Sequence, residues 1–165
     1  MTLTAPGFLR ATHRLIAWTA ILVGCIAMLS GTVHAQAENS VLDKLMKKTS
    51  IKYTKNGGVY VAQFTGKSLK QFPMLIAADG DTVIMIAVVA EKEKFKKTPE
   101  LVEGLAMASM DNPLLKVGLV KAGDMVVRVD ALIESLDSDD LEKLINKAAL
   151  GADAIHKQFS RNISR

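Results

Sequence analysis

The chain has 165 residues, of which 49% are hydrophobic, with 21 lysines and arginines against 17 aspartates and glutamates. This length is typical of one domain, and a net charge of +4 gives no support for a nucleic-acid partner. One cysteine excludes an intramolecular disulfide. Cys25 and two of the three histidines lie within the first 35 residues, so the rest of the chain has one histidine and no cysteine, too few of the usual ligands for a structural zinc site.

Residues 1–35 have the pattern of a signal peptide. Arg10 and Arg14 form a positively charged segment, and a continuous apolar run follows them. The run ends in a small-residue pattern with Val33 and Ala35 as the cleavage residues. The sequence therefore predicts an exported protein, which is periplasmic if its source is a Gram-negative bacterium.

Two other interpretations of this segment stay open. Cys25 follows Leu-Val-Gly, which fits the lipidation site of a lipoprotein, although apolar residues continue after it. A retained membrane anchor would need about 20 apolar residues, and the stretch 30–32 interrupts the run before that length. Cleavage after Ala35 would leave one domain, residues 36–165, with no stable membrane insertion.

The first half of the mature chain predicts one helix followed by strands. A helix over 40–48 begins at Ser40, a good N-cap residue. Strand patterns follow, joined by turns that contain Gly57 and Gly80. We expect these strands over 51–54, 59–65, 72–78 and 82–90.

The strand predicted over 82–90 is apolar at nearly every position. Because strand side chains alternate between two faces, one face carries Ile84, Ile86 and Val88. Helices of a small domain cover one sheet face, and an apolar second face marks an interaction surface unless the loop 66–72 or the first helix covers it. We expect these three residues to form such a surface. We also expect Ile86→Asp to unfold the domain, since a carboxylate in an apolar strand lacks a partner.

The second half predicts two helices around a hairpin. A Thr-Pro cap starts the helix over 98–111, and the last helix starts near Asp137. Strands over 116–120 and 125–130 lie between them. Since every strand-to-strand step is a short turn, the sequence predicts an α+β fold with an antiparallel sheet flanked by helices, in the order α-β(3-4)-α-β(2)-α.

Several of these features occur together in one known family. They are the strand Phe72-Pro73-Met74-Leu75-Ile76, the turn Asp79-Gly80-Asp81, the helix start Thr98-Pro99-Glu100-Leu101, Asn112, Lys116 and the strand Val127-Arg128-Val129. With them, residues 51–159 resemble the YbjN-like family, which has a type III secretion chaperone-like fold. The resemblance implies a domain without enzymatic activity in sensory, regulatory or chaperone-like roles. Folds of this kind tend to pair, so it also implies a homodimer or a protein partner.

Residues that carry chemistry are scarce after residue 35. His156 is the only histidine there, and Asp153 lies three positions before it. A base oriented by Asp153 would need a nucleophile beside it, and the spacing favours a surface histidine next to an apolar helix stripe. The acidic segment 137–140 lacks the glycine and the distal glutamate of an EF-hand and suits a helix start. The sequence therefore predicts no catalytic, metal-binding or cofactor-binding residues.

The function predicted from the sequence is binding. We expect an exported, non-enzymatic module of the cell envelope that is protein-binding, chaperone-like or regulatory, with another protein or its own copy as partner. The alternative is a small lipid- or ligand-carrying domain, which would need a deep apolar cavity between sheet and helices. A hydrolytic enzyme is the least supported class, because its residues are missing.

Overall fold

The computed structural model describes the backbone of residues 35–163, and side chains from residue 41 onward. The predicted signal peptide, with Val33 and Cys25, lies outside this range except for Ala35. The described chain has three α-helices, six strands and two short 3-10 helices. The helices are α2 (Ala35–Met46), α3 (Pro99–Asp111) and α4 (Ser138–Gln158), and the strands are β1 (Tyr53–Asn56), β2 (Val59–Phe64), β3 (Phe72–Asp79), β4 (Thr82–Ala90), β5 (Lys116–Leu119) and β6 (Met125–Leu132).

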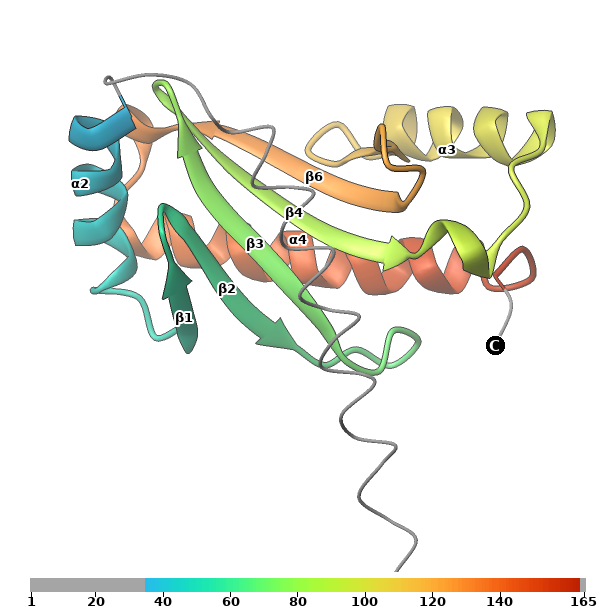
Figure 1. Cartoon of the computed structure of the whole chain (residues 1–165), viewed down its shortest axis with the longest axis horizontal. Coiled ribbons are helices and arrows are strands. Elements are labelled where there is room, and N and C mark those ends of the chain that lie inside the picture. The colour runs from blue at the N-terminus through green and yellow to red at the C-terminus, as the bar shows by residue number, and fades with distance from the viewer. Residues whose placement is uncertain (1–34, 164–165) are drawn as a thin grey trace, which may run out of the picture. The chain divides into compact units, whose positions relative to one another are not determined.

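All six strands form one antiparallel sheet in the order β1-β2-β3-β4-β6-β5 (Figure 1). The predicted α+β class and antiparallel sheet are confirmed, with four strands before α3 and two after it. Gly57 and Gly80 have φ values of 59° and 61°, which glycine adopts without strain. They close the β1–β2 and β3–β4 turns and so help to fix the register within each of these two strand pairs.

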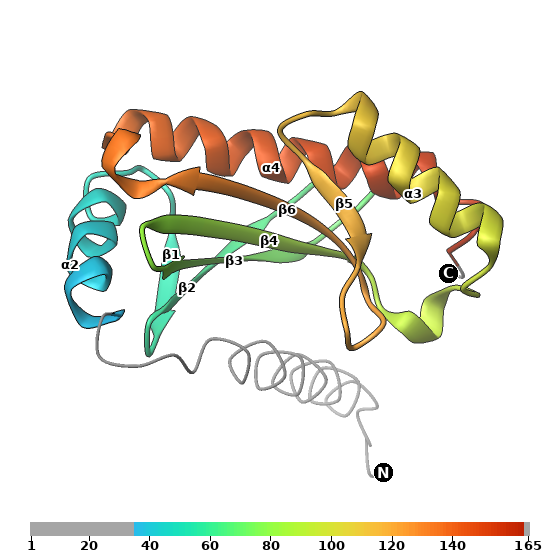
Figure 2. The ribbon, with the colours of Figure 1, turned by 90° about the horizontal axis from the view of Figure 1, so that it is seen from above.

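The long C-terminal helix α4 lies across one face of the sheet, over β4 and β6 (Figure 2). It begins as predicted, because the Asp137 side chain accepts a hydrogen bond of 2.8 Å from the Asp140 N–H. Leu141 and Ile145 on α4 are fully buried in one core with Val83 and Met85 on β4. The apolar residues of α4, spaced by three and four positions, therefore pack against the alternate apolar residues of β4.

The other two helices lie at the ends of the sheet. α3 packs beside β5, and its start is capped by Thr98, whose hydroxyl accepts a hydrogen bond of 3.2 Å from the Leu101 N–H. α2 packs on β3 and α4, and its described part already includes Ala35, ahead of the predicted start at Ser40. The prediction was wrong because alanine, glutamine and glutamate before Ser40 are good helix formers and extend the helix past the cap residue.

The structure corrects the predicted effect of Ile86→Asp on stability. The alternation on β4 is as expected, but Ile86 is half-buried and points away from α4, whereas Met85 is fully buried beneath it. Ile86 also lies in register with Arg128 on β6, so a carboxylate at this position would have a guanidinium as neighbour. Ile86 is therefore a residue of the outer face and does not belong to the core. Within the described residues, no helix combines the length and the apolar character that crossing a membrane requires.

We expect Met85→Asp and Ile86→Asp to differ sharply in stability. The buried, unpaired carboxylate at position 85 should cost on the order of 3–5 kcal/mol, enough to unfold many domains. The same change at position 86 should cost about 1–2 kcal/mol, from lost apolar burial alone. Denaturant unfolding followed by circular dichroism measures both. Equal destabilisation by the two substitutions would contradict the placement of α4.

Candidate functional site

The sheet face opposite α4 is the candidate binding surface, and we call it the open face. The strand registers and the burial pattern place alternate residues of every strand on it. They are Thr54, Val59, Val61, Gln63, Pro73, Leu75, Ala77, Ile84, Ile86, Val88, Val126, Arg128, Asp130, Lys116 and Gly118. The three residues predicted from the sequence, Ile84, Ile86 and Val88, therefore lie together at the middle of this face.

An apolar row crosses the centre of the open face. Val61, Leu75 and Ile86 are cross-strand partners on β2, β3 and β4, and all three are half-buried. In the neighbouring row, Val59, Ala77 and Ile84 are cross-strand partners that are each only 7% exposed. None of the described helices lies over these rows in Figures 1 and 2. The exposed apolar surface therefore comes from the row of Val61, Leu75 and Ile86, and a contiguous row of partly exposed aliphatic side chains is the kind of surface that protein partners cover.

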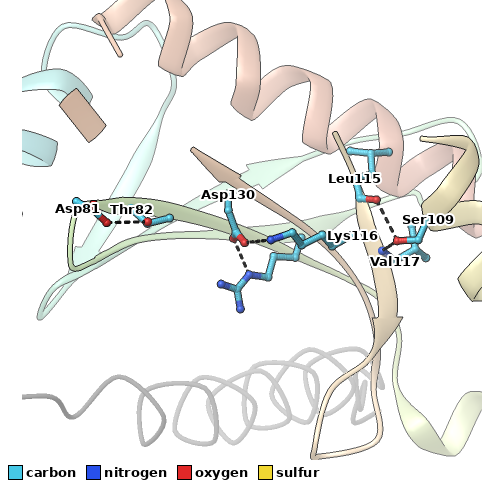
Figure 3. Close-up of polar contacts among 8 residues, drawn as sticks. Asp81, Thr82, Ser109, Leu115, Lys116, Val117 and Asp130 are labelled. Carbon is cyan, nitrogen blue, oxygen red and sulfur yellow. Dashed lines mark hydrogen bonds and ion pairs between the residues drawn. The ribbon is translucent and has the colours of Figure 1, made fainter. Parts of the chain in front are cut away.

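A charged cluster borders the apolar rows on β5 and β6 (Figure 3). The Asp130 carboxylate accepts hydrogen bonds from Arg128, at 2.6 Å from Nε, and from the Lys116 ammonium. Burial raises the pKa of Asp130, but these hydrogen bonds and charges outweigh it and leave the pKa below its ordinary value. The cluster thus keeps one uncompensated positive charge beside Ile86.

Sequence reasoning missed this cluster, although one signal was present. Arg128 and Asp130 are separated by two positions in an otherwise apolar strand, which puts both on the same face. The contact with Lys116 depended on the β5–β6 register and could not be deduced before the pairing was known.

The two edges of the sheet differ. At the β5 edge, the Ser109 hydroxyl of α3 accepts a hydrogen bond of 2.9 Å from the Val117 N–H and donates one of 3.2 Å to the Leu115 carbonyl (Figure 3). These bonds use backbone groups that an added strand would need. At the other edge, β1 has only β2 as a neighbour, and residues 54–56 are exposed.

A second apolar surface lies on the outer side of α3. Val102, Met107 and Met110 are exposed there, and Leu114 follows the helix. These side chains lie on the side of α3 that faces away from the sheet, so they do not belong to the open face. They form a competing candidate for a contact surface, which an experiment has to separate from the open face.

His156 and Asp153 do not form a catalytic arrangement. His156 is half-buried, and its Nδ1 lies 2.7 Å from the Ser68 hydroxyl, so the predicted free surface histidine has a partner from the β2–β3 loop. Asp153 does not orient the imidazole. Its carboxylate accepts hydrogen bonds from the backbone N–H groups of Lys67, Ser68 and Leu69, at 3.1, 2.7 and 2.7 Å.

This geometry indicates that the cluster holds a loop in place. The backbone N–H groups of residues 67–69, which an oxyanion beside Ser68 would need, are already bound to Asp153. Among the described residues, no third group donates to or accepts from His156 to orient it as in a triad. The signal in the sequence was the polar segment Gly66-Lys67-Ser68, whose backbone N–H groups need partners from outside the strands. In the described part of the chain, no group of three acidic, histidine or cysteine side chains is placed to hold a metal ion.

The comparisons with known proteins concern the fold. No protein-family model matches the sequence, and no curated protein matches it. Solved structures do resemble it. YbjN from E. coli, a candidate transcription regulator, superposes with a TM-score of 0.59 at 8% identity, covering 81% of this chain and 98% of YbjN. A chain of the HopA1–SchA chaperone–effector complex gives 0.51 at 12% identity, covering 76% and 98%.

A third structure has a lower score. The Yersinia pestis type III secretion chaperone SycH, in complex with a fragment of YscM2, gives a TM-score of 0.44 at 9% identity, covering 70% of this chain and 92% of SycH. The first two similarities extend over nearly the whole length of the matched chains. The described domain therefore has a YbjN-like, type III secretion chaperone-like fold, as the sequence resemblance predicted.

Proposed function

We propose that this domain is a non-enzymatic binding module that holds a segment of another polypeptide against the open face. The observation that carries the proposal is the apolar row formed by Val61, Leu75 and Ile86, which none of the described helices covers. Each of these residues retains accessible apolar surface, whose removal from water favours association by about 25 cal/mol per Å². The similarity to a chaperone–effector complex supports the same kind of function.

The open face also suggests what the bound segment looks like. The apolar rows fit aliphatic or aromatic side chains, and the Lys116–Asp130–Arg128 cluster beside them keeps a net positive charge. An acidic group that follows an apolar stretch would therefore pair with the free hydrogen-bonding capacity of Arg128. A rim charge of this kind sets orientation and association rate more than affinity.

The experiment uses one disruptive change and two matched controls. Ile86→Asp places a charge in the centre of the open face, Met110→Asp places it on the outer side of α3, and Leu150→Asp places it on an α4 residue that is 72% exposed. Tagged full-length proteins are purified from the producing cells, and the bound polypeptides are quantified by mass spectrometry. We expect Ile86→Asp to reduce bound partner at least tenfold, while the other two retain it.

Two outcomes would contradict the proposal. The first is partner retention by a folded Ile86→Asp protein, with loss in Met110→Asp, which would assign binding to α3. The second is equal retention by all three variants. Sedimentation of the same samples identifies a second copy as the partner, because Ile86→Asp would then convert a dimer into a monomer.

We also propose that the module is exported and acts in the cell envelope. The proposal is supported by Arg10, Arg14, the apolar run and the residues Val33 and Ala35. Intact-mass measurement of protein from the envelope fraction should give a chain that begins at Gln36. A full-length mass would contradict export with cleavage, and a lipid-modified start at Cys25 would contradict the soluble form.

A further inference from the structure

The loop between β2 and β3 is held to α4 by a polar cluster, which we call the loop latch. It consists of Asp153 and His156 on α4 and residues 66–69 of the loop. Four hydrogen bonds of 2.7–3.1 Å join the two segments, three to the Asp153 carboxylate and one between Ser68 and His156. The Gly66 N–H closes the loop on itself with a bond of 2.9 Å to the Leu69 carbonyl.

Gly66 shows how closely the loop approaches the helix. A Cβ atom added at Gly66 would lie 2.2 Å from Asp153 Oδ1 and 2.5 Å from its Cγ, well inside van der Waals contact. Any larger residue at this position must push the loop or the carboxylate away. The latch therefore has a closed state that depends on one glycine and one carboxylate.

We propose that the loop latch is acid-sensitive, so that protonation of His156 shifts the β2–β3 loop from the closed state to an open state. In the open state the loop N–H groups exchange with water, and Leu69, which packs against the core when the latch is closed, becomes exposed. The device is independent of the proposed binding function, since it needs only the contacts between the loop and α4.

The direction of the pH dependence follows from the burial of His156. Burial lowers the pKa of His156, and the nearby Asp153 carboxylate raises it by less. In the open state the imidazole is in water and has its ordinary pKa, so the open state binds the proton more tightly. Closure is therefore fully stabilised above about pH 6.5 and weakens as the pH falls below that value.

Other charged groups act at different pH values. Hydrogen bonds from Leu69, Ser68 and Lys67, partly opposed by burial, leave the pKa of Asp153 below its ordinary value, so this carboxylate stays ionised until strongly acid pH. The loop itself carries the basic residues Lys67 and Lys70, and Lys157 follows His156 on α4. Between pH 7.5 and 5, His156 is the group of the latch that changes charge.

Hydrogen exchange of the full-length protein, corrected for intrinsic rates, tests the proposal at the Lys67, Ser68 and Leu69 amides. We expect their protection to fall several-fold from pH 7.5 to 5, while amides in β3 and β4 keep theirs. In His156→Gln the loop protection should not change with pH. In Gly66→Ala it should be low at both pH values, whereas Gly118→Ala, where an added Cβ meets nothing within 4 Å, should behave as wild type.

Three results would overturn the proposal. They are constant loop protection in the wild type, the same acid response in His156→Gln, and a simultaneous loss of protection in β3 and β4. A proton NMR titration of the His156 ring measures its pKa in the wild type and tests the proposal without any variant. A midpoint below that of the urea-unfolded chain supports the latch, and an equal or higher midpoint overturns it.

Discussion

The packing of α4 against β4 and β6 is the contact on which the rest of the structure depends. β4 and β6 are neighbours in the sheet, and α4 runs across both (Figure 2). Its fully buried residues Leu141 and Ile145 meet the fully buried side of β4. The same helix also contacts α2 and fixes the β2–β3 loop through Asp153. One element therefore orders segments that are distant in the sequence.

A single helix over a six-stranded sheet covers one face only, and that asymmetry is the basis of the proposed function. Neither alternative cover is observed: Asp153 ties the loop after β2 to α4, and α2 packs on β3 and α4 at the sheet end. Apolar residues such as Leu75 and Ile86 consequently stay partly exposed on the open face. At the β5 edge, Ser109 of α3 occupies the Val117 N–H and the Leu115 carbonyl, so this edge has fewer free backbone groups for an added strand.

Local sequence patterns predicted the helices and strands. The features that the sequence did not predict depend on contacts between residues that are distant in the chain. The two-residue alternation of β4 and the cap residues Thr98 and Asp137 correctly gave strand faces and helix starts. The alternation could not say which of the two faces α4 covers, so Ile86→Asp was wrongly expected to unfold the domain although Ile86 lies on the face opposite α4. The contact of Ser68 with His156 spans 88 positions, and no local signal reports such a pair. The cell-envelope location and the use of Ile84, Ile86 and Val88 in binding stay predictions.

Site-specific photo-crosslinking in the producing cells tests the central claim most directly, because it reports what lies on the open face of the native protein. A photoreactive residue is placed at position 86 and, for comparison, at position 150 on the outer side of α4. The account predicts a discrete adduct with a polypeptide, another protein or a second copy, from position 86 and none from position 150. Adducts of equal yield from both positions, or an adduct from position 150 alone, would contradict it.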